Sequence, residues 1–174
     1  MSKSKKEAFM ELYTPVHDRF ERFCRARVYG DTDFKDLMHD SIVIAYEKLD
    51  KLDDPKAFLH FLFGISIRVL ANTNRKQRLL QMSDEAHRIP DESLRADRNE
   101  DVHILYQALA KLPEPQREAL VLFEISGFSI AEISDLQESG ISAVKQRLAR
   151  GRKALLALLQ ESELHPSKTN AYDK

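Results

Sequence analysis

Hydrophobic residues recur every three or four positions along most of the chain, which is the spacing that lines one face of an α-helix. The first such stripe consists of Phe9, Leu12, Tyr13, Val16, Phe20 and Phe23. Pro15 interrupts this stripe, so we expect a second helix to begin there, with Thr14 as its N-terminal cap. Residues 29–33 then break the pattern.

A second amphipathic helix is predicted from residue 34 to about residue 49. Its apolar face consists of Phe34, Leu37, Met38, Ser41, Ile42, Ala45, Tyr46 and Leu49. Residues 50–56, rich in Asp and Lys, predict a loop, and a third helix follows from about residue 58 to about residue 78. These segments predict an N-terminal helical domain over residues 5–78.

The hydrophobic pattern disappears between residues 79 and 102. This segment has seven acidic and three basic residues and no sustained apolar stripe. We therefore predict an acidic linker between two domains. A solvated helix is the alternative that so weak a pattern leaves open.

Helical spacing resumes at residue 103. Two amphipathic helices are predicted over residues 103–112 and 115–126, because Pro113 and Gly127 interrupt the pattern at their ends.

Ser129 and Glu132 have the spacing of a capping box, which predicts the start of a short helix that ends near residue 136. A turn over residues 137–140 separates it from a final helix that ends near residue 160, and the tail over residues 161–174 is expected to fray. The predicted fold class is all-α, with two small helical domains, residues 5–78 and 103–160, joined by the acidic linker over residues 79–102.

Positive charge is concentrated on the final helix of a chain that is almost neutral. The formal net charge at pH 7 is −1 over 174 residues, whereas residues 143–155 hold five basic residues and no acidic residue. Bases gathered on one helix are typical of a surface that contacts nucleic-acid phosphates. The alternative is an ordinary solvated helix.

On a helical wheel this basic helix has two different faces. The inner face consists of Ile141, Val144, Leu148, Gly151 and Leu155, where the glycine would permit close helix packing. The outer face consists of Ser142, Gln146, Ala149, Arg150 and Lys153, with Lys145, Arg147 and Arg152 on the flanks. Gln and Arg can form paired hydrogen bonds to base edges, and flanking bases can contact phosphates. With the short helix before it, this pattern predicts a helix-turn-helix that enters a DNA major groove.

The turn of this predicted helix-turn-helix lacks the usual early glycine. Such turns need a residue with positive φ, which glycine adopts without strain. Glu138 occupies that position here, and Gly140 comes later, where it can cap the final helix. The sequence therefore leaves the geometry of this turn open.

Cysteine usage and hydropathy indicate where the protein works. The single cysteine, Cys24, can form neither an internal disulfide nor a CxxC zinc site, which fits a reducing compartment. The basic N-terminus has no apolar signal-peptide core, and the most apolar window, residues 58–71, is too short to span a bilayer. These features predict a cytoplasmic protein without membrane insertion.

Residues 112–159 resemble the C-terminal domain of extracytoplasmic-function (ECF) sigma factors of bacterial RNA polymerase. The matching positions are Leu112, Pro113, Arg117, Ser129, Glu132, Ile133, Val144, Lys145, Arg147, Leu148, Arg150, Arg152 and Leu155. Residues 36–77 are similar to the N-terminal domain of the same family. The two matches cover most of the chain and stand in the family's order.

The resemblance implies a protein that binds core RNA polymerase and directs it to promoter DNA. The C-terminal domain would read the minus-thirty-five element through Ser142, Lys145, Gln146, Arg147, Arg150 and Lys153. The surface that meets polymerase would consist of Asp36, Leu37, His39, Asp40, Val43 and Ile44. The N-terminal domain would open the minus-ten element and hold its single strand with Phe61, Phe63, Arg68, Asn72, Arg75 and Lys76. An anti-sigma factor is a further expected partner, and no cofactor is expected.

The chain departs from the family pattern at several positions. It has no Trp, and Tyr46 and Phe61 stand where the family often has one. Gly64 and Ile67 stand at positions that are often basic. Phe63 and Ile67 are expected to project away from the core, as surfaces on which bases stack; packing against the linker is the alternative.

Three other functions are compatible with the sequence. A DNA-binding regulator would use its N-terminal half as a sensor or dimerisation module, without polymerase. A sigma-like protein would bind polymerase or a regulator without opening promoters. An enzyme would need a metal at Asp36, His39 and Asp40, but such a site requires further ligands, and the other histidines show no ligand spacing. We therefore predict no catalytic residue and no metal site.

Overall fold

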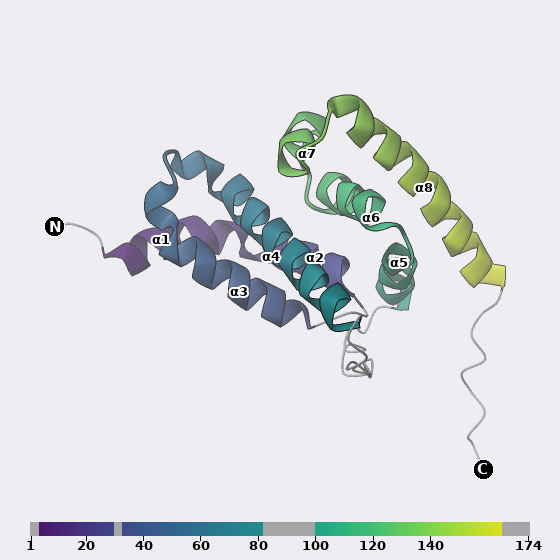
Figure 1. The fold of residues 1–174 in the computed structure, drawn as a ribbon, viewed down its shortest axis with the longest axis horizontal. Coiled ribbons are helices and arrows are strands. Elements are labelled where there is room, and N and C mark those ends of the chain that lie inside the picture. Colours follow the sequence, from purple (N-terminus) through teal and green to yellow (C-terminus); the bar gives the residue numbers. More distant parts are fainter. Residues whose placement is uncertain (1–3, 30–32, 82–99, 165–174) are drawn as a thin grey trace, which may run out of the picture.

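A computed structural model of the chain describes residues 4–29, 33–81 and 100–164, and every regular element within them is helical (Figure 1). The N-terminal half consists of α1 (Lys5–Tyr13), α2 (His17–Val28), α3 (Phe34–Glu47) and α4 (Phe58–Gln81). The C-terminal half consists of α5 (Glu100–Ala110), α6 (Glu114–Leu120), α7 (Ile130–Leu136) and α8 (Ile141–Leu164). The predicted all-α fold class is confirmed.

Short helical turns of other types join several of these elements. Thr14–Val16, Leu49–Lys51 and Pro55–Ala57 are 3-10 turns, and Val121–Ile125 is a π-helical turn that continues α6. The expected N-terminal cap at Thr14 is wrong, because Thr14 is the C-cap of α1 and the first residue of the 3-10 turn, and α2 begins only at His17. The Thr14 hydroxyl instead donates a hydrogen bond to the Met10 carbonyl at 2.7 Å.

The predicted acidic linker lies mostly outside the described residues. Its first residues, 79–81, continue α4, and its last residues, 100–102, begin α5. Both helices are therefore longer than their apolar spacing predicted. The end of a helix that is exposed to solvent can continue without apolar residues, so the pattern does not mark it. The helix α8 likewise extends beyond its predicted end to Leu164, and the rest of the predicted tail lies outside the described residues.

In the N-terminal half, α3 packs between α2 and α4. The stripe predicted for α3 forms its buried face, which holds Leu37, Met38, Ser41 and Ala45. Tyr46 lies at the edge of this face and is 37% exposed. Its ring packs edge-on against Phe9, with the centroids 5.5 Å apart, and the Lys5 ammonium lies 5.5 Å from its centroid.

In the C-terminal half, α8 packs on α5, α6 and α7 (Figure 1). Val144 and Leu148 are buried, as predicted. Gly151 permits the expected close approach, because a Cβ atom there would lie 3.0 Å from Leu120 Cδ1. The prediction is wrong for Ile141, which is 50% exposed. Helical side chains lean toward the N-terminus, so the side chain of this first residue extends past the end of the helix.

The two halves pack against each other and share one hydrophobic core. The helix α2 contacts α5 and the π-helical turn, and α4 contacts α7. Phe63 of α4 is fully buried, with its ring centroid 4.5 Å from that of Phe23 and 4.9 Å from that of Phe128. The expectation that Phe63 projects away from the core is therefore wrong, because the C-terminal half covers that side of α4. Ile67 is half-buried and also packs against the core.

We expect Gly151→Ala to be less stable than a matched Gly64→Ala variant. The methyl group at residue 151 would press on the buried Leu120 side chain, whereas a Cβ at residue 64 makes an ordinary contact with Leu136 Cδ2 at 3.6 Å. Both substitutions gain roughly 1 kcal/mol of helix propensity. Denaturant unfolding should show a difference of about 1–3 kcal/mol in favour of Gly64→Ala. Equal stabilities would contradict the close packing of α8 on α6.

Candidate nucleic-acid interface

The outer face of α8 is exposed and basic. Ser142, Gln146, Ala149, Arg150 and Lys153, which we call the α8 face, are all exposed, and so is Lys145 on its flank. At about 100° per residue, the five residues of the α8 face lie within about 60° of Gln146. Small and polar side chains at the centre, with bases around them, form a surface whose shape and charge suit a DNA major groove.

The helix α7 begins at the predicted capping box. The Glu132 backbone N–H donates to Ser129 Oγ at 3.3 Å, and the Ser129 backbone N–H donates to Glu132 Oε2 at 2.7 Å. This backbone hydrogen bond, together with one from the Ser129 hydroxyl, lowers the pKa of the Glu132 carboxyl. The capping carboxylate therefore stays charged at neutral pH and fixes the start of the helix-turn-helix.

The turn between α7 and α8 has a left-handed residue at the position that the sequence indicated. Glu138 has a φ of 49°, a value that favours glycine. Gly140 follows just before α8, and its carbonyl accepts a hydrogen bond from the Val144 backbone N–H at 3.1 Å. The Ser134 hydroxyl also donates to the Ser139 carbonyl. These hydrogen bonds hold the turn in shape, although its left-handed residue is a glutamate and not a glycine.

Arg147, on the flank of α8, is half-buried and ties the recognition helix to this turn. Its Nη1 donates to Gln137 Oε1 at 2.8 Å and to Ser139 Oγ at 2.9 Å. Sequence reasoning assigned Arg147 to DNA phosphate and missed these contacts. The contact of Arg147 with phosphate stays a prediction.

The exposed residues of α4 form a second stripe. Phe61, Arg68, Asn72 and Arg75, with Lys76 beside them, make up the α4 face. The first four lie within about 60° of one another around the helix. Phe61 is half-buried and the others are exposed. Phe63 lies about 140° away from Arg68, which is why it faces the core.

The outer side of α3 forms a third surface. Asp36, His39, Asp40 and Val43 are exposed and share one side of the helix, which we call the α3 face. Leu37 is buried and Ile44 packs partly against the core, so neither presents a free surface. His39 Nδ1 lies 3.6 Å from Asp40 Oδ1, and both side chains are largely exposed. In the part of the chain that the structure describes, no group of three or more His, Cys, Asp or Glu side chains could hold a metal ion.

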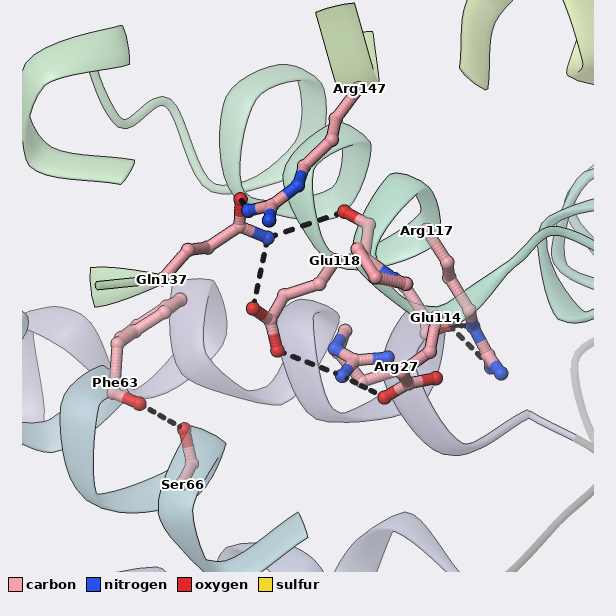
Figure 2. A network of polar contacts seen from close by, with 10 residues as sticks. Arg27, Phe63, Ser66, Glu114, Arg117, Glu118, Gln137 and Arg147 are labelled. Carbon is pink, nitrogen blue, oxygen red and sulfur yellow. Dashed lines mark hydrogen bonds and ion pairs between the residues drawn. The ribbon is translucent and has the colours of Figure 1, made fainter. Parts of the chain in front are cut away.

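Two buried arginines at the junction of the halves were missed by the sequence analysis. Arg27 of α2 and Arg117 of α6 are each 2% exposed. Arg27 Nη2 donates to Glu114 Oε1 at 2.6 Å and to Glu118 Oε2 at 3.0 Å (Figure 2). The signal for Arg27 was its position, because it continues the buried stripe of α2 that contains Phe20 and Phe23.

The electrostatics of this junction follow from the buried guanidinium of Arg27. Burial by itself raises the pKa of Glu114, but the charge of Arg27 and its hydrogen bond, with the charge of Arg117, outweigh it and lower that pKa. Glu114 is therefore ionised at neutral pH and compensates the buried positive charge.

Comparisons with known proteins agree with one another. A family model described as sigma-70, region 4, matches residues 103–155. The RNA polymerase sigma factor NccH of Alcaligenes xylosoxydans xylosoxydans is 30% identical over 151 residues, which cover 80% of this chain and 81% of that protein. No helix among the described residues is long and apolar enough to cross a membrane.

Solved structures match both halves together. The sigma factor RpoE from Bartonella quintana, in complex with the anti-sigma factor NepR, is similar with a TM-score of 0.74 and 25% identity, covering 87% of this chain and 96% of that chain. CnrH in complex with the cytosolic domain of CnrY is similar with a TM-score of 0.65 and 26% identity, covering 90% of each chain.

We expect Glu138→Gly to stabilise the C-terminal half by about 0.5–1 kcal/mol, because glycine adopts positive φ without the clash of a Cβ atom. The matched change is Gly127→Ala, which places a Cβ on a residue with a φ of 73° and should destabilise. Denaturant unfolding of both variants measures the two signs. A Glu138→Gly protein that is less stable than the natural one would argue against the left-handed turn.

Proposed function

The chain belongs to the extracytoplasmic-function sigma factors of bacterial RNA polymerase, and from this we propose how its three exposed helical faces divide the work. A sigma factor is a transcription initiation factor and not an enzyme: it binds core RNA polymerase and directs it to particular promoters. The proposal assigns one macromolecular partner to each face. The α3 face and the α4 face belong to the domain over residues 5–78, and the α8 face belongs to the domain over residues 103–160.

The α8 face enters the major groove of the minus-thirty-five element. One observation carries this assignment. The α8 face is exposed, and α8 has no acidic residue before Glu161. Gln146 and Arg150 stand one turn apart on this face and are assigned to base edges. Lys145 lies on the flank and Lys153 lies further along the same face toward the C-terminus, and both are assigned to phosphates. Ser142 is at the N-terminal end of the same stripe.

The α3 face binds core RNA polymerase through Asp36, His39, Asp40 and Val43. Two observations support this assignment: the stripe is polar and exposed, and Val43 is 40% exposed and does not pack in the core. Leu37 contributes by holding α3 in the bundle, since its side chain is buried. Ile44 borders this surface.

The α4 face holds the minus-ten strand. Arg68, Arg75 and Lys76 supply exposed positive charge that follows a nucleic-acid backbone, and Phe61 with Asn72 lies on the same stripe. Phe63 is covered by Phe128 in this arrangement and offers no stacking surface.

The cellular setting follows from the polymerase. A factor that acts with RNA polymerase works in the cytoplasm, where the polymerase is. An anti-sigma factor is proposed as a regulatory partner, since the similar structure of RpoE is a complex with the anti-sigma factor NepR, and that of CnrH is a complex with the cytosolic domain of CnrY.

Transcription in vitro with purified core polymerase and a promoter library tests the function directly. The chain should support initiation at a defined subset of promoters. A protein that binds those sequences tightly without polymerase, and supports no initiation, would instead be a DNA-binding regulator.

Arg150→Ala should change sequence preference at one base pair of the minus-thirty-five element, at a cost of about 1–3 kcal/mol against the preferred base. Lys153→Ala should weaken all promoters alike and reduce the salt dependence, because a phosphate contact carries no sequence information. Initiation across the promoter library at several salt concentrations measures both effects. If the two variants weaken every sequence equally, Arg150 does not read a base.

Asp40→Arg should weaken binding to core polymerase by about tenfold or more, since a reversed charge at a complementary surface costs over 1.4 kcal/mol. Asp53→Arg, a charge reversal at another exposed residue outside the α3 face, is the control and should bind as the natural protein does. Affinity for core polymerase is measured with folded protein, checked by circular dichroism. Unchanged affinity in folded Asp40→Arg removes this surface from the interface.

A further inference from the structure

Arg147 stands at the border between the buried and the exposed side of α8. It lies about 60° around the helix from the buried Val144 and about 60°, in the opposite sense, from the exposed Arg150. Arg147 itself is half-buried. Part of its guanidinium therefore meets protein, while the residue borders the α8 face that is assigned to DNA.

The protein holds this guanidinium by a single nitrogen. Arg147 Nη1 donates to Gln137 Oε1 at 2.8 Å and to Ser139 Oγ at 2.9 Å (Figure 2). The guanidinium also carries N–H groups on Nη2 and Nε, and these lie side by side on the edge that matches two oxygens of a phosphate. The contacts with Gln137 and Ser139 do not use that edge.

Gln137 is held in turn by α6. Its Nε2 donates to Glu118 Oε1 at 3.0 Å and to the Pro115 carbonyl at 3.3 Å (Figure 2). A carboxylate only accepts hydrogen bonds and a guanidinium only donates them, so an amide can join the two with both of its ends satisfied. We call Glu118, Gln137 and Ser139 the Arg147 clasp.

The Arg147 clasp holds the guanidinium without neutralising its charge. The groups that accept from Nη1 are an uncharged amide and an uncharged hydroxyl, and Gln137 stands between Arg147 and the carboxylate of Glu118. Arg152, on the opposite flank of α8, differs, because its Nη2 lies 2.8 Å from Glu124 Oε1 in a direct ion pair. Arg147 thus keeps a positive charge that is available to an anion.

We propose that Gln137 is a positioning residue for binding of the minus-thirty-five element: with Ser139 it fixes Nη1 of Arg147, and so prepares the edge with Nη2 and Nε for a DNA phosphate. The inference rests on the proposed function and adds to it a residue that touches no DNA itself. A flexible arginine loses rotamer freedom when it binds phosphate, whereas one that is held beforehand has already lost it. The clasp therefore increases affinity through preorganisation.

A purely structural clasp is the alternative. Ser139 directly follows Glu138, whose φ is 49°, so the same contacts also hold the turn between α7 and α8. Such a role affects the stability of the turn and does not require a phosphate at Arg147. The two roles differ in the salt dependence of DNA binding, because each phosphate contact releases counterions.

The first test measures promoter affinity of the complex of each variant with core polymerase at several salt concentrations. Arg147→Met should weaken all promoters alike and lower the slope of log affinity against log salt by about 0.9, the contribution of one phosphate. Gln137→Met should weaken all promoters about three- to tenfold, because Arg147 is then ordered only on binding, and should keep the slope because the charge remains. An unchanged slope in folded Arg147→Met would make the clasp purely structural and overturn the proposal.

Two further variants control this comparison. Gln107→Met makes the same change at an exposed position of α5 and should bind as the natural chain does. Ser139→Ala removes the other acceptor of Arg147 Nη1 and should weaken all promoters as Gln137→Met does, so it replaces that variant if Gln137→Met does not fold. Folding is checked by circular dichroism. Natural affinity in a folded clasp variant would overturn the proposal.

The second test combines the changes at residues 137 and 147. If Gln137 acts through Arg147, Gln137→Met should cause no further loss of promoter affinity in a chain that already carries Arg147→Met. A loss of equal size in both backgrounds would show that Gln137 acts by another route, and would overturn the proposal while the protein remains an active sigma factor. Failure of the natural chain to initiate at any promoter would instead refute the proposed function.

Discussion

The guanidinium of Arg27 is the contact on which the arrangement of this molecule depends. It is buried in α2, and its partners, Glu114 and Glu118, come from the other half of the chain. A buried charge that loses its partners is strongly destabilising, so Arg27 tolerates burial only while α6 stands beside it. Because α8 packs on α6, that pairing also positions the recognition helix relative to the N-terminal bundle.

The features that depend on one helix at a time were predictable from the sequence. The α8 face and the capping box at Ser129 follow from local spacing and local hydrogen bonding, and the structure has both of them. The sequence left the geometry of the turn at Glu138 open, and the structure has a left-handed residue there. The all-α fold was predictable for the same reason. The DNA and polymerase contacts of these faces rest on the family resemblance, since exposure and charge alone do not name a partner.

The features that depend on contacts between two different helices were not predictable from the spacing of apolar residues along one helix. Phe63 is buried because Phe128 covers it, and Arg27 meets residues 87 and 91 positions away in the chain. Periodicity shows which side of a helix is apolar but not which distant helix lies against it. The arginine within the stripe of α2 was the one visible sign of such a partner, and it indicates a pairing without identifying it.

The central claim is that the pairing of Arg27 with Glu114 and Glu118 holds the C-terminal half against the N-terminal bundle. Fluorescent labels at Lys51→Cys and Gln160→Cys, both exposed positions in opposite halves, allow changes in their separation to be followed by single-molecule energy transfer. The account predicts a lower transfer efficiency in Arg27→Glu than in the natural chain, because the new carboxylate repels Glu114 and Glu118. A folded Arg27→Glu protein with the transfer efficiency of the natural chain would contradict it.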